Sequence, residues 1–243
     1  MHQKLLKISL VGITNAGKST LLNKIIGETV SIINKKINTT QDLIKGIINI
    51  SNIQIIFYDT PGLNILKHKD KIIGIGLDSS ELENPPKKFE KLFQKAIKEG
   101  FLTVAHAGEG GPPEHIWDSI NLLKVKRIDH GVQCFHDEKL VVKLRNDQIP
   151  LTVCPLSNVK LCVFEKLENH NLKRLLDKGL MVTVNSDDPA YFGGYLNRNM
   201  IDCQKALNLS MEDVKKLAIN SFKSSFLSED EKKKWIDQIN NLS

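Results

Sequence analysis

A histidine and a carboxylate follow an apolar run near the middle of the chain. After residues 103–105 comes His106, and Glu109 follows three residues later. An apolar strand with these side chains at its end is typical of a (β/α) barrel hydrolase, because such barrels place their chemistry at the C-terminal ends of their strands. A single histidine in this position is more often structural. The prediction of an active site therefore depends on the neighbouring motifs.

Four other apolar runs also end in polar residues of defined type. The first ends in Asp78 and Glu81, the third in His130, the fourth in residues 154–158 and the fifth in Asp187. If these runs are parallel strands, their ends converge at the mouth of one barrel. Imidazole and carboxylate groups suit zinc, and a catalytic zinc site keeps one position open for water. The sequence therefore predicts a zinc site built by the strand ends.

The elements that must position these residues alternate between strand and helix. The predicted strands are 72–77, 101–105, 127–129, 150–154 and 180–184. The predicted helices are 86–100, 113–123, 137–146 and 161–178, followed by a helical C-terminal segment from about residue 199. This alternation indicates parallel βαβ units, but a closed barrel needs eight strands. The predicted fold is thus α/β, with an incomplete (β/α) TIM-type barrel of the metal-dependent hydrolase kind over residues 72–243.

The N-terminal part of the chain has a different pattern, a G-x-x-x-x-G-K-S motif at residues 12–19. It lies between a predicted strand, 7–11, and a predicted helix, 20–26, which is the context of a phosphate-binding loop. Predicted strands 47–50 and 54–58 follow. The second leads into Asp59, which would act on Mg²⁺ through water if its strand lies parallel to the first. The residues predicted to bind a magnesium nucleotide are Gly12, Asn15, Gly17, Lys18, Ser19, Thr20, Asp59 and Gly62.

Residues 4–66 resemble the first part of the GTPase Era, with two threonines at 39–40 in the first switch and residues 59–62 in the second. The resemblance implies GTP and Mg²⁺ as ligands. The Asn-Lys-x-Asp motif with which that family reads guanine does not occur after Gly62. We therefore predict a partial P-loop GTPase fragment over residues 1–66, with phosphate affinity but no guanine selectivity, and a polar junction over 67–71.

The C-terminal motifs resemble those of the adenosine deaminase family, at residues 106–109, 128–131 and 185–189. The motifs that resemble its adenine deaminase branch are residues 111–114, 150–158 and 188–195. The resemblance implies zinc-dependent hydrolytic deamination of adenine to hypoxanthine and ammonia in purine salvage, or of adenosine to inosine. Two alternatives stay open, namely a nucleotide-binding module that uses the P-loop and an inactive fusion of two gene fragments.

This resemblance also implies a role for each site residue. His106 and Asp187 would bind zinc, which would acidify the water that attacks C6 of the purine. Glu109 would protonate ring N1, and this requires that burial raise its pKa. His130 would orient the attacking water and help to deprotonate it.

Two further residues would contact the substrate, and two expected ligands are missing. Asp188 would bind N7 of the purine, and Ser79 would approach the edge of the base. The family takes two more zinc ligands from a His-x-His at its first barrel strand, and this sequence contains no His-x-His. We therefore predict weakened zinc binding, and self-association or complementation by another chain through the open edges of the barrel.

Composition limits the other classes of function. The formal charge is 34 − 28 = +6 without a concentrated basic stripe, so nucleic-acid binding is not predicted. No apolar run could span a bilayer and no signal peptide is evident, so the predicted compartment is the cytoplasm. His115, His136 and His170 are predicted to be surface residues. The cysteines show no C-x-x-C spacing and are assigned no chemistry; they are Cys134, Cys154, Cys162 and Cys203. For Cys154, a buried thiol in a strand is expected.

Overall fold

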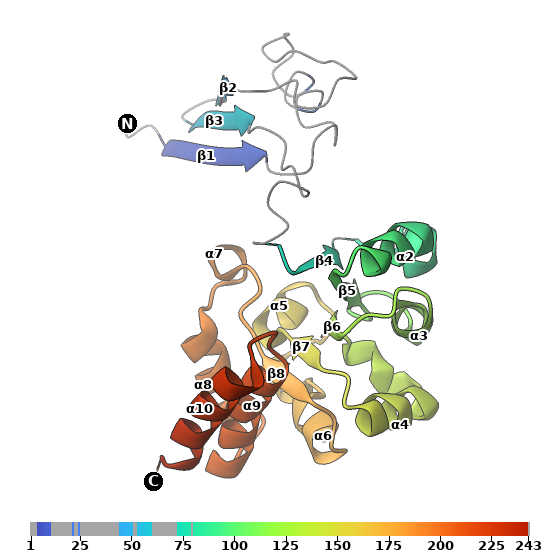
Figure 1. Cartoon of the computed structure of the whole chain (residues 1–243). Helices are drawn as coiled ribbons and strands as arrows, with labels where there is room; N and C mark the ends of the chain where they lie inside the picture. Colours follow the sequence, from blue (N-terminus) through green and yellow to red (C-terminus); the bar gives the residue numbers. More distant parts are fainter. Residues whose placement is uncertain are drawn as a thin grey trace. The chain divides into compact units, whose positions relative to one another are not determined.

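The computed structural model describes residues 72–78 and 80–242, together with the backbone of strands 4–10, 44–50 and 53–59 and the positions Leu21 and Lys24. The chain divides into two compact units, Met1–Ile73 and Gly74–Ser243. Both units are drawn in Figure 1. The predicted junction, 67–71, and Ser79 lie outside the described residues.

Among its described residues, the first unit has three strands, β1 (Lys4–Leu10), β2 (Ile44–Ile50) and β3 (Ile53–Asp59), in the order β1-β3-β2. β1 runs parallel to β3, with Leu10 opposite Asp59, and β2 runs antiparallel to β3. The predicted parallel pairing of the strand that ends at Asp59 is confirmed. The other predicted nucleotide-binding residues, Gly12 to Thr20 and Gly62, lie outside the described residues, so nucleotide binding stays a prediction.

The second unit is built on a parallel five-stranded sheet (Figure 1). Its strands follow one another in chain order: β4 (Gly74–Leu77), β5 (Leu102–Ala107), β6 (Arg127–His130), β7 (Leu151–Val153) and β8 (Val182–Val184). The five predicted strands and their parallel pairing are confirmed. Because all five run in one direction, the residues that follow them meet at one edge of the sheet.

Helices connect the strands and cover one side of the sheet. α2 and α3 pack against β5, whereas α6, α8 and α9 pack against β8. The α-helices are α2 (Glu90–Lys98), α3 (Pro113–Asn121), α4 (Glu138–Asp147), α5 (Pro155–Lys160), α6 (Leu172–Asp177), α7 (Pro189–Phe192), α8 (Leu196–Ala206), α9 (Met211–Lys223) and α10 (Glu229–Asn240). The 3₁₀ helices are η1 (Pro86–Phe89), η2 (Val132–His136) and η3 (Leu167–Asn169).

The helix predicted over 161–178 is wrong in its first part. Residues 161–166 form turns and bends, and a helix stands earlier, at α5. Pro155 occupies the first position of α5, where its fixed φ and missing N–H favour a helix start. The chain returns to helix only at η3 and α6.

The two faces of the sheet differ in polarity, because successive side chains in a strand point to opposite sides. Ala105, Ile128 and Val153 are buried among the hydrophobic core residues. The alternate positions carry polar groups that include His106 and Asp129. These groups line a cavity of about 450 Å³, and its other lining residues come from the strands, from the loops that follow them and from the end of α9: Asp78, Arg127, His130, Thr152, Cys154, Thr183, Asn185, Asp187, Ser221, Ser224 and Ser225.

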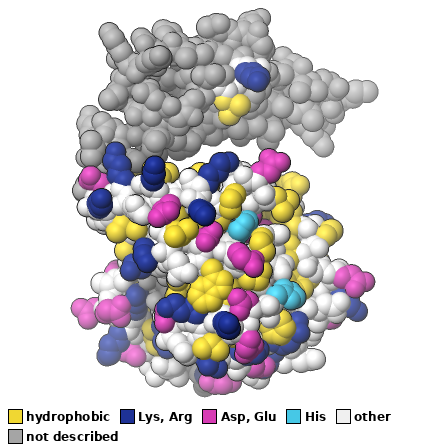
Figure 2. Space-filling view, turned by 90° about the vertical axis from the view of Figure 1, so that its right-hand side faces the viewer, with side chains coloured by type: hydrophobic (Ala, Val, Ile, Leu, Met, Phe, Trp, Pro, Cys, Tyr) yellow, Lys and Arg dark blue, Asp and Glu magenta, His cyan; other side chains and the backbone are white. Residues whose placement is uncertain are grey.

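The surface of the second unit mixes charges of both signs. Figure 2 shows Lys and Arg side chains interspersed with Asp and Glu over one face, with hydrophobic side chains between them. Within the described ranges, no helix has the length and apolar character needed to cross a membrane.

Candidate functional site

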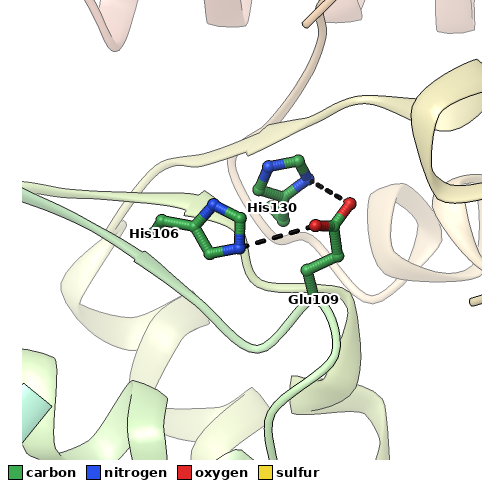
Figure 3. Close-up of side chains that lie close together, drawn as sticks. All are labelled: His106, Glu109 and His130. Atoms are coloured by element: carbon green, nitrogen blue, oxygen red, sulfur yellow. Dashed lines mark ion pairs between the residues drawn. The ribbon is translucent and has the colours of Figure 1, made fainter. Parts of the chain in front are cut away.

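Two histidines and a glutamate converge where β5 and β6 end (Figure 3). His106 lies near the end of β5, Glu109 lies in the loop after it, and His130 is the last residue of β6. The Nε2 atom of His106 is 3.5 Å from Oε2 of Glu109, and Nδ1 of His130 is 3.1 Å from Oε1 of the same carboxylate. Glu109 and His130 are 6% and 5% exposed. The structure thus brings together three residues that the sequence assigned to one site.

A buried carboxylate, Glu81, holds the loop that carries Glu109. It accepts hydrogen bonds from the backbone N–H groups of Gly108 (2.7 Å), Glu109 (2.9 Å), Gly110 (3.2 Å) and Gly111 (3.2 Å). Consecutive N–H groups that point to one place form an anion-binding concavity. Here the anion is supplied by the chain itself, from the segment after β4.

The charge of Glu81 is favoured by these contacts. Burial by itself raises the pKa of this carboxyl, but the hydrogen bond with His106 and those from the loop backbone outweigh burial and hold its pKa well below its usual range. His115 Nδ1 lies 3.2 Å from its Oε2. No role for Glu81 was predicted from the sequence, where its place in the polar run after the first strand is the signal that points to it.

The backbone around the site adopts conformations that few side chains tolerate. His130 and Asp187 have positive φ values, 66° and 55°. Such values are uncommon outside glycine and cluster at functional sites. Gly108 has φ +72°, and a Cβ at this position would lie 2.3 Å from Cδ1 of Ile116. The loop between His106 and Glu109 therefore requires glycine at this position.

A series of hydrogen bonds links the Glu109 carboxylate to Asn158, His170 and the backbone of Leu172. Asn158 Nδ2 donates to Glu109 Oε1 at 2.5 Å, and His170 Nε2 donates to Asn158 Oδ1 at 3.1 Å. The backbone N–H of Leu172 donates to His170 Nδ1 at 3.0 Å, so one ring nitrogen of His170 accepts and the other donates. This assignment makes His170 a neutral imidazole.

The prediction that three histidines lie on the surface is wrong for two of them. His170 is 3% exposed, and the His115 side chain is 13% exposed beside Glu81. Only His136 of these three is exposed. The physical reason is that Asn158 and Glu81, both distant in sequence, give the two buried rings hydrogen-bond partners.

The stability of the chain should fall in acid because of His170. Burial, followed by the nearby charge of Arg174, lowers its pKa from 6.5 to about 3. Between these two values the unfolded chain binds one more proton, so the free energy of unfolding decreases by about 1 kcal/mol for each pH unit below 6.5 and is unaffected above it. Urea unfolding of His170→Asn protein should show a smaller decrease in the free energy of unfolding between pH 7 and pH 5 than the wild type shows.

The matched control for this prediction is His136→Asn, which alters an exposed histidine. Its dependence of stability on pH should equal that of the wild type, because this substitution leaves the buried His170 and its hydrogen bonds in place. Equal slopes in all three proteins would contradict the assignment of a neutral, buried His170.

The predicted increase in the pKa of Glu109 is wrong for this arrangement. Burial does raise it, but the hydrogen bond with His130, the charges of His130 and His106 and the Asn158 hydrogen bond act in the opposite direction and prevail. The sequence indicated burial correctly. The hydrogen-bonding side chains around the carboxylate decide the net direction.

Asp187 lies on the other side of His130, three residues after the end of β8. Its Oδ2 accepts a hydrogen bond from Ser157 Oγ at 2.6 Å and is 4.0 Å from His130 Nε2. Asp188 is exposed and caps α7, because its Oδ1 accepts the backbone N–H of Tyr191 at 3.4 Å. Its predicted contact with a purine stays a prediction, as does that of Ser79.

Among the residues that the structure describes, two groups of side chains have the donor atoms and spacing of a metal site. One is His106, Glu109 and His130, and the other is His130, Cys154 and Asp187, with the donor atoms of each group within 4.8 Å of one another. Imidazole, thiol and carboxylate are all zinc ligands, so the residues fit this metal. In the part of the chain that the structure describes, no such group contains both His106 and Asp187.

No chemistry was predicted for Cys154 from the sequence. The residue directly follows β7 and is buried, and its Sγ donates to the backbone oxygen of Thr152 at 3.6 Å. Burial, and then the charge of Asp187, raises the pKa of this thiol far above its usual range. Cys134 and Cys203 are buried as well, and Cys162 is exposed.

A second cavity, of about 490 Å³, opens directly over the histidines and Glu109. Its apolar lining residues are Leu82, Leu161, Val163 and Phe192, and Asp187 lines it as well. Apolar walls with a few convergent polar groups are the usual surroundings of a small-molecule ligand.

Comparison with known proteins agrees with this site. The family model described as adenosine deaminase matches residues 55–242. An adenine deaminase of Acinetobacter baylyi is 58% identical over 177 residues, which are 73% of this chain and 53% of that protein. The crystal structure of an adenine deaminase from Arthrobacter aurescens has a TM-score of 0.71 and 48% identity, and covers 72% of this chain and 54% of that one.

A more distant solved structure, a Burkholderia ambifaria amidohydrolase with bound zinc, has a TM-score of 0.65 and 26% identity. The match covers 70% of this chain and 49% of that one. The chain spans about half the length of the curated relatives it matches. The fold, the convergent side chains and the matched family model lead to one conclusion: the chain belongs to the adenosine deaminase family.

Proposed function

We propose that this chain carries the site of a zinc-dependent deaminase that converts adenine to hypoxanthine and ammonia, with adenosine as the alternative substrate. The convergence of His106, Glu109 and His130 at the C-terminal ends of two adjacent parallel strands is the observation that carries the proposal. The relatives described as adenine deaminases support the choice of substrate.

The proposal includes zinc as the metal. His106 and Asp187 are the ligands implied by the family resemblance, and the donor atoms around His130 suit the same ion. When bound, zinc supplies a Lewis acid that makes water nucleophilic at neutral pH. The relative with bound zinc supports this choice of metal.

The chain's own residues would move the protons. Hydrolysis adds water at C6 of the purine and releases ammonia, so one group must take a proton from water and another must exchange a proton with ring N1. His130 Nε2 faces away from Glu109, whose carboxylate holds Nδ1 at 3.1 Å, and can accept the proton of water. Glu109 lies in the wall of the second cavity and can exchange a proton with N1.

The surroundings of Glu109 would fix its orientation during this exchange. Asn158 donates a hydrogen bond to the Glu109 side chain. Glu81 accepts one from the Glu109 backbone N–H. Positioning of the reacting groups before the chemical step is a large part of enzymatic rate enhancement. Asp188 and Ser79 complete the proposal as contacts of the purine.

Ammonia release tests this function. The purified full chain, incubated with increasing zinc, should convert adenine faster than adenosine, and prior removal of zinc with a chelator should abolish the reaction. The zinc series matters because the chain lacks a His-x-His and is expected to bind the metal weakly. A folded protein that releases no ammonia from either purine at any zinc concentration would refute the proposal.

A further inference from the structure

We propose that His170 is a positioning residue, which decides through Asn158 which oxygen of Glu109 exchanges a proton with the purine. His170 lies between η3 and α6 and is 3% exposed, and Asn158 lies in α5 and is fully buried. The inference rests on the proposed function, in which Glu109 acts on ring N1. It gives a part in the reaction to a buried imidazole that the proposed mechanism does not use.

The direction of the hydrogen bonds in this series follows from a backbone N–H group, which can only donate. The N–H of Leu172 donates to Nδ1 of His170 at 3.0 Å, so Nδ1 carries no proton. A neutral imidazole then carries its proton on Nε2, which donates to Oδ1 of Asn158 at 3.1 Å. Burial, followed by the nearby charge of Arg174, keeps the ring neutral because it lowers the pKa of His170 to about 3.

The ring of His170 therefore fixes the orientation of the Asn158 amide. With Oδ1 turned to His170, the Nδ2 group lies 2.5 Å from Oε1 of Glu109 and 3.2 Å from Nδ1 of His130. An amide nitrogen donates and does not accept, so Nδ2 donates to Oε1. The N–H of His130 has no acceptor in the amide either, and it donates to the same Oε1 at 3.1 Å.

Two donors on Oε1 of Glu109 leave Oε2 as the oxygen that exchanges the proton. Oε2 lies on the side of His106, 3.5 Å from its Nε2, and both residues line the cavity of about 490 Å³. A proton on Oε1 would face two N–H groups and no acceptor, which is unfavourable. The same arrangement keeps the proton of His130 on Nδ1, so its Nε2 is able to accept a proton from water.

A reversed Asn158 amide would remove both effects. Its Oδ1 would then lie beside Oε1 of Glu109, where two oxygens repel each other unless one of them carries a proton. A proton shared between these two oxygens would not be available to ring N1. Loss of the donor at His170 permits this reversal, so it should slow the chemical step without weakening the binding of the purine.

A pair of substitutions at His170 separates positioning from packing. Asparagine places its amide oxygen near the position of Nδ1, so it keeps an acceptor for Leu172 but is too short to donate to Asn158. Glutamine reaches further and keeps that donor. In ammonia release by the zinc-supplemented full chain, His170→Asn should lower kcat by about 10–100-fold with little change in KM. His170→Gln should recover most of this loss.

The effect should also depend on Glu109. In protein that already carries Glu109→Gln, this side chain exchanges no proton, so the addition of His170→Asn should lower kcat no further. A packing defect would instead multiply the two losses. His136→Asn alters an exposed histidine and should turn over adenine at the wild-type rate. Multiplied losses in the double variant, or equal losses in His170→Asn and His170→Gln protein, would overturn the inference.

Nitrogen-15 NMR of the histidine rings tests the tautomer without turnover. The measurement uses the wild-type full chain, with the His170 ring assigned through its own backbone signals, so it does not depend on the folding of a variant. At neutral pH the ring should carry a proton on Nε2 and none on Nδ1. A proton on Nδ1, or on both nitrogens, would contradict the proposed orientation of Asn158 and refute the inference.

The kinetic assay separates the failure of this inference from the failure of the proposed function. Ammonia release by the wild type at a rate that His170→Asn protein matches would leave the deaminase function standing and remove His170 from it. A wild type that releases no ammonia would refute the function, and the catalytic role of His170 with it, even if NMR showed the proton on Nε2.

Discussion

Glu109→Gln should reduce the turnover of adenine by about 10²–10⁴-fold, the usual contribution of a positioned acid or base. An amide cannot exchange a proton with ring N1, although its oxygen can still accept the hydrogen bond that Asn158 donates to Glu109. We therefore expect kcat to fall while KM and the thermal midpoint change little. Steady-state kinetics of ammonia release and a thermal unfolding curve on the same sample measure all three quantities.

The control for this substitution is Glu114→Gln, which alters an exposed glutamate in α3. It should turn over adenine at the wild-type rate. If Glu109→Gln protein kept its kcat within a factor of about ten of the wild type, proton exchange by Glu109 would be refuted. An equal decrease in kcat in Glu109→Gln and Glu114→Gln protein would indicate a general effect of the lost negative charge.

Glu81→Ala should lower the free energy of unfolding by about 3–5 kcal/mol. The substitution leaves the N–H groups of residues 108–111 without their carboxylate partner, and each buried donor left unsatisfied costs about 1–3 kcal/mol before water enters the gap. Urea unfolding of the full chain measures the change. Because the same loop carries Glu109, turnover should fall as well.

Two further variants sharpen this prediction. Glu83→Ala alters an exposed glutamate two residues away and should leave stability near that of the wild type. Glu81→Gln keeps one side-chain oxygen as an acceptor. Its free energy of unfolding should therefore lie between those of Glu81→Ala and Glu83→Ala. A loss of less than about 1 kcal/mol in Glu81→Ala protein would show that the carboxylate does not hold the loop.

The sequence by itself determined the alternation of elements and the positions of the strand ends in the second unit. Strand formation depends on local apolar patterning, and the residues that follow a strand are adjacent to it along the chain. The five strands were therefore predictable, and so was the meeting of His106, Glu109 and His130. The sequence motifs also indicated the family that the comparison confirms.

Only the tertiary structure decided the contacts that join distant segments. Glu81 anchors a loop that begins 27 residues later, and His170 is buried because Asn158 meets it across a turn. Cys154 reaches Asp187 only through the pairing of β7 with β8. The pKa of Glu109 was also decided by the tertiary structure. Burial raises this pKa and hydrogen bonds lower it, so the net direction depends on where the neighbouring side chains lie. Patterning specifies which face of an element is buried, whereas the partners of a buried polar group are set by how the elements pack.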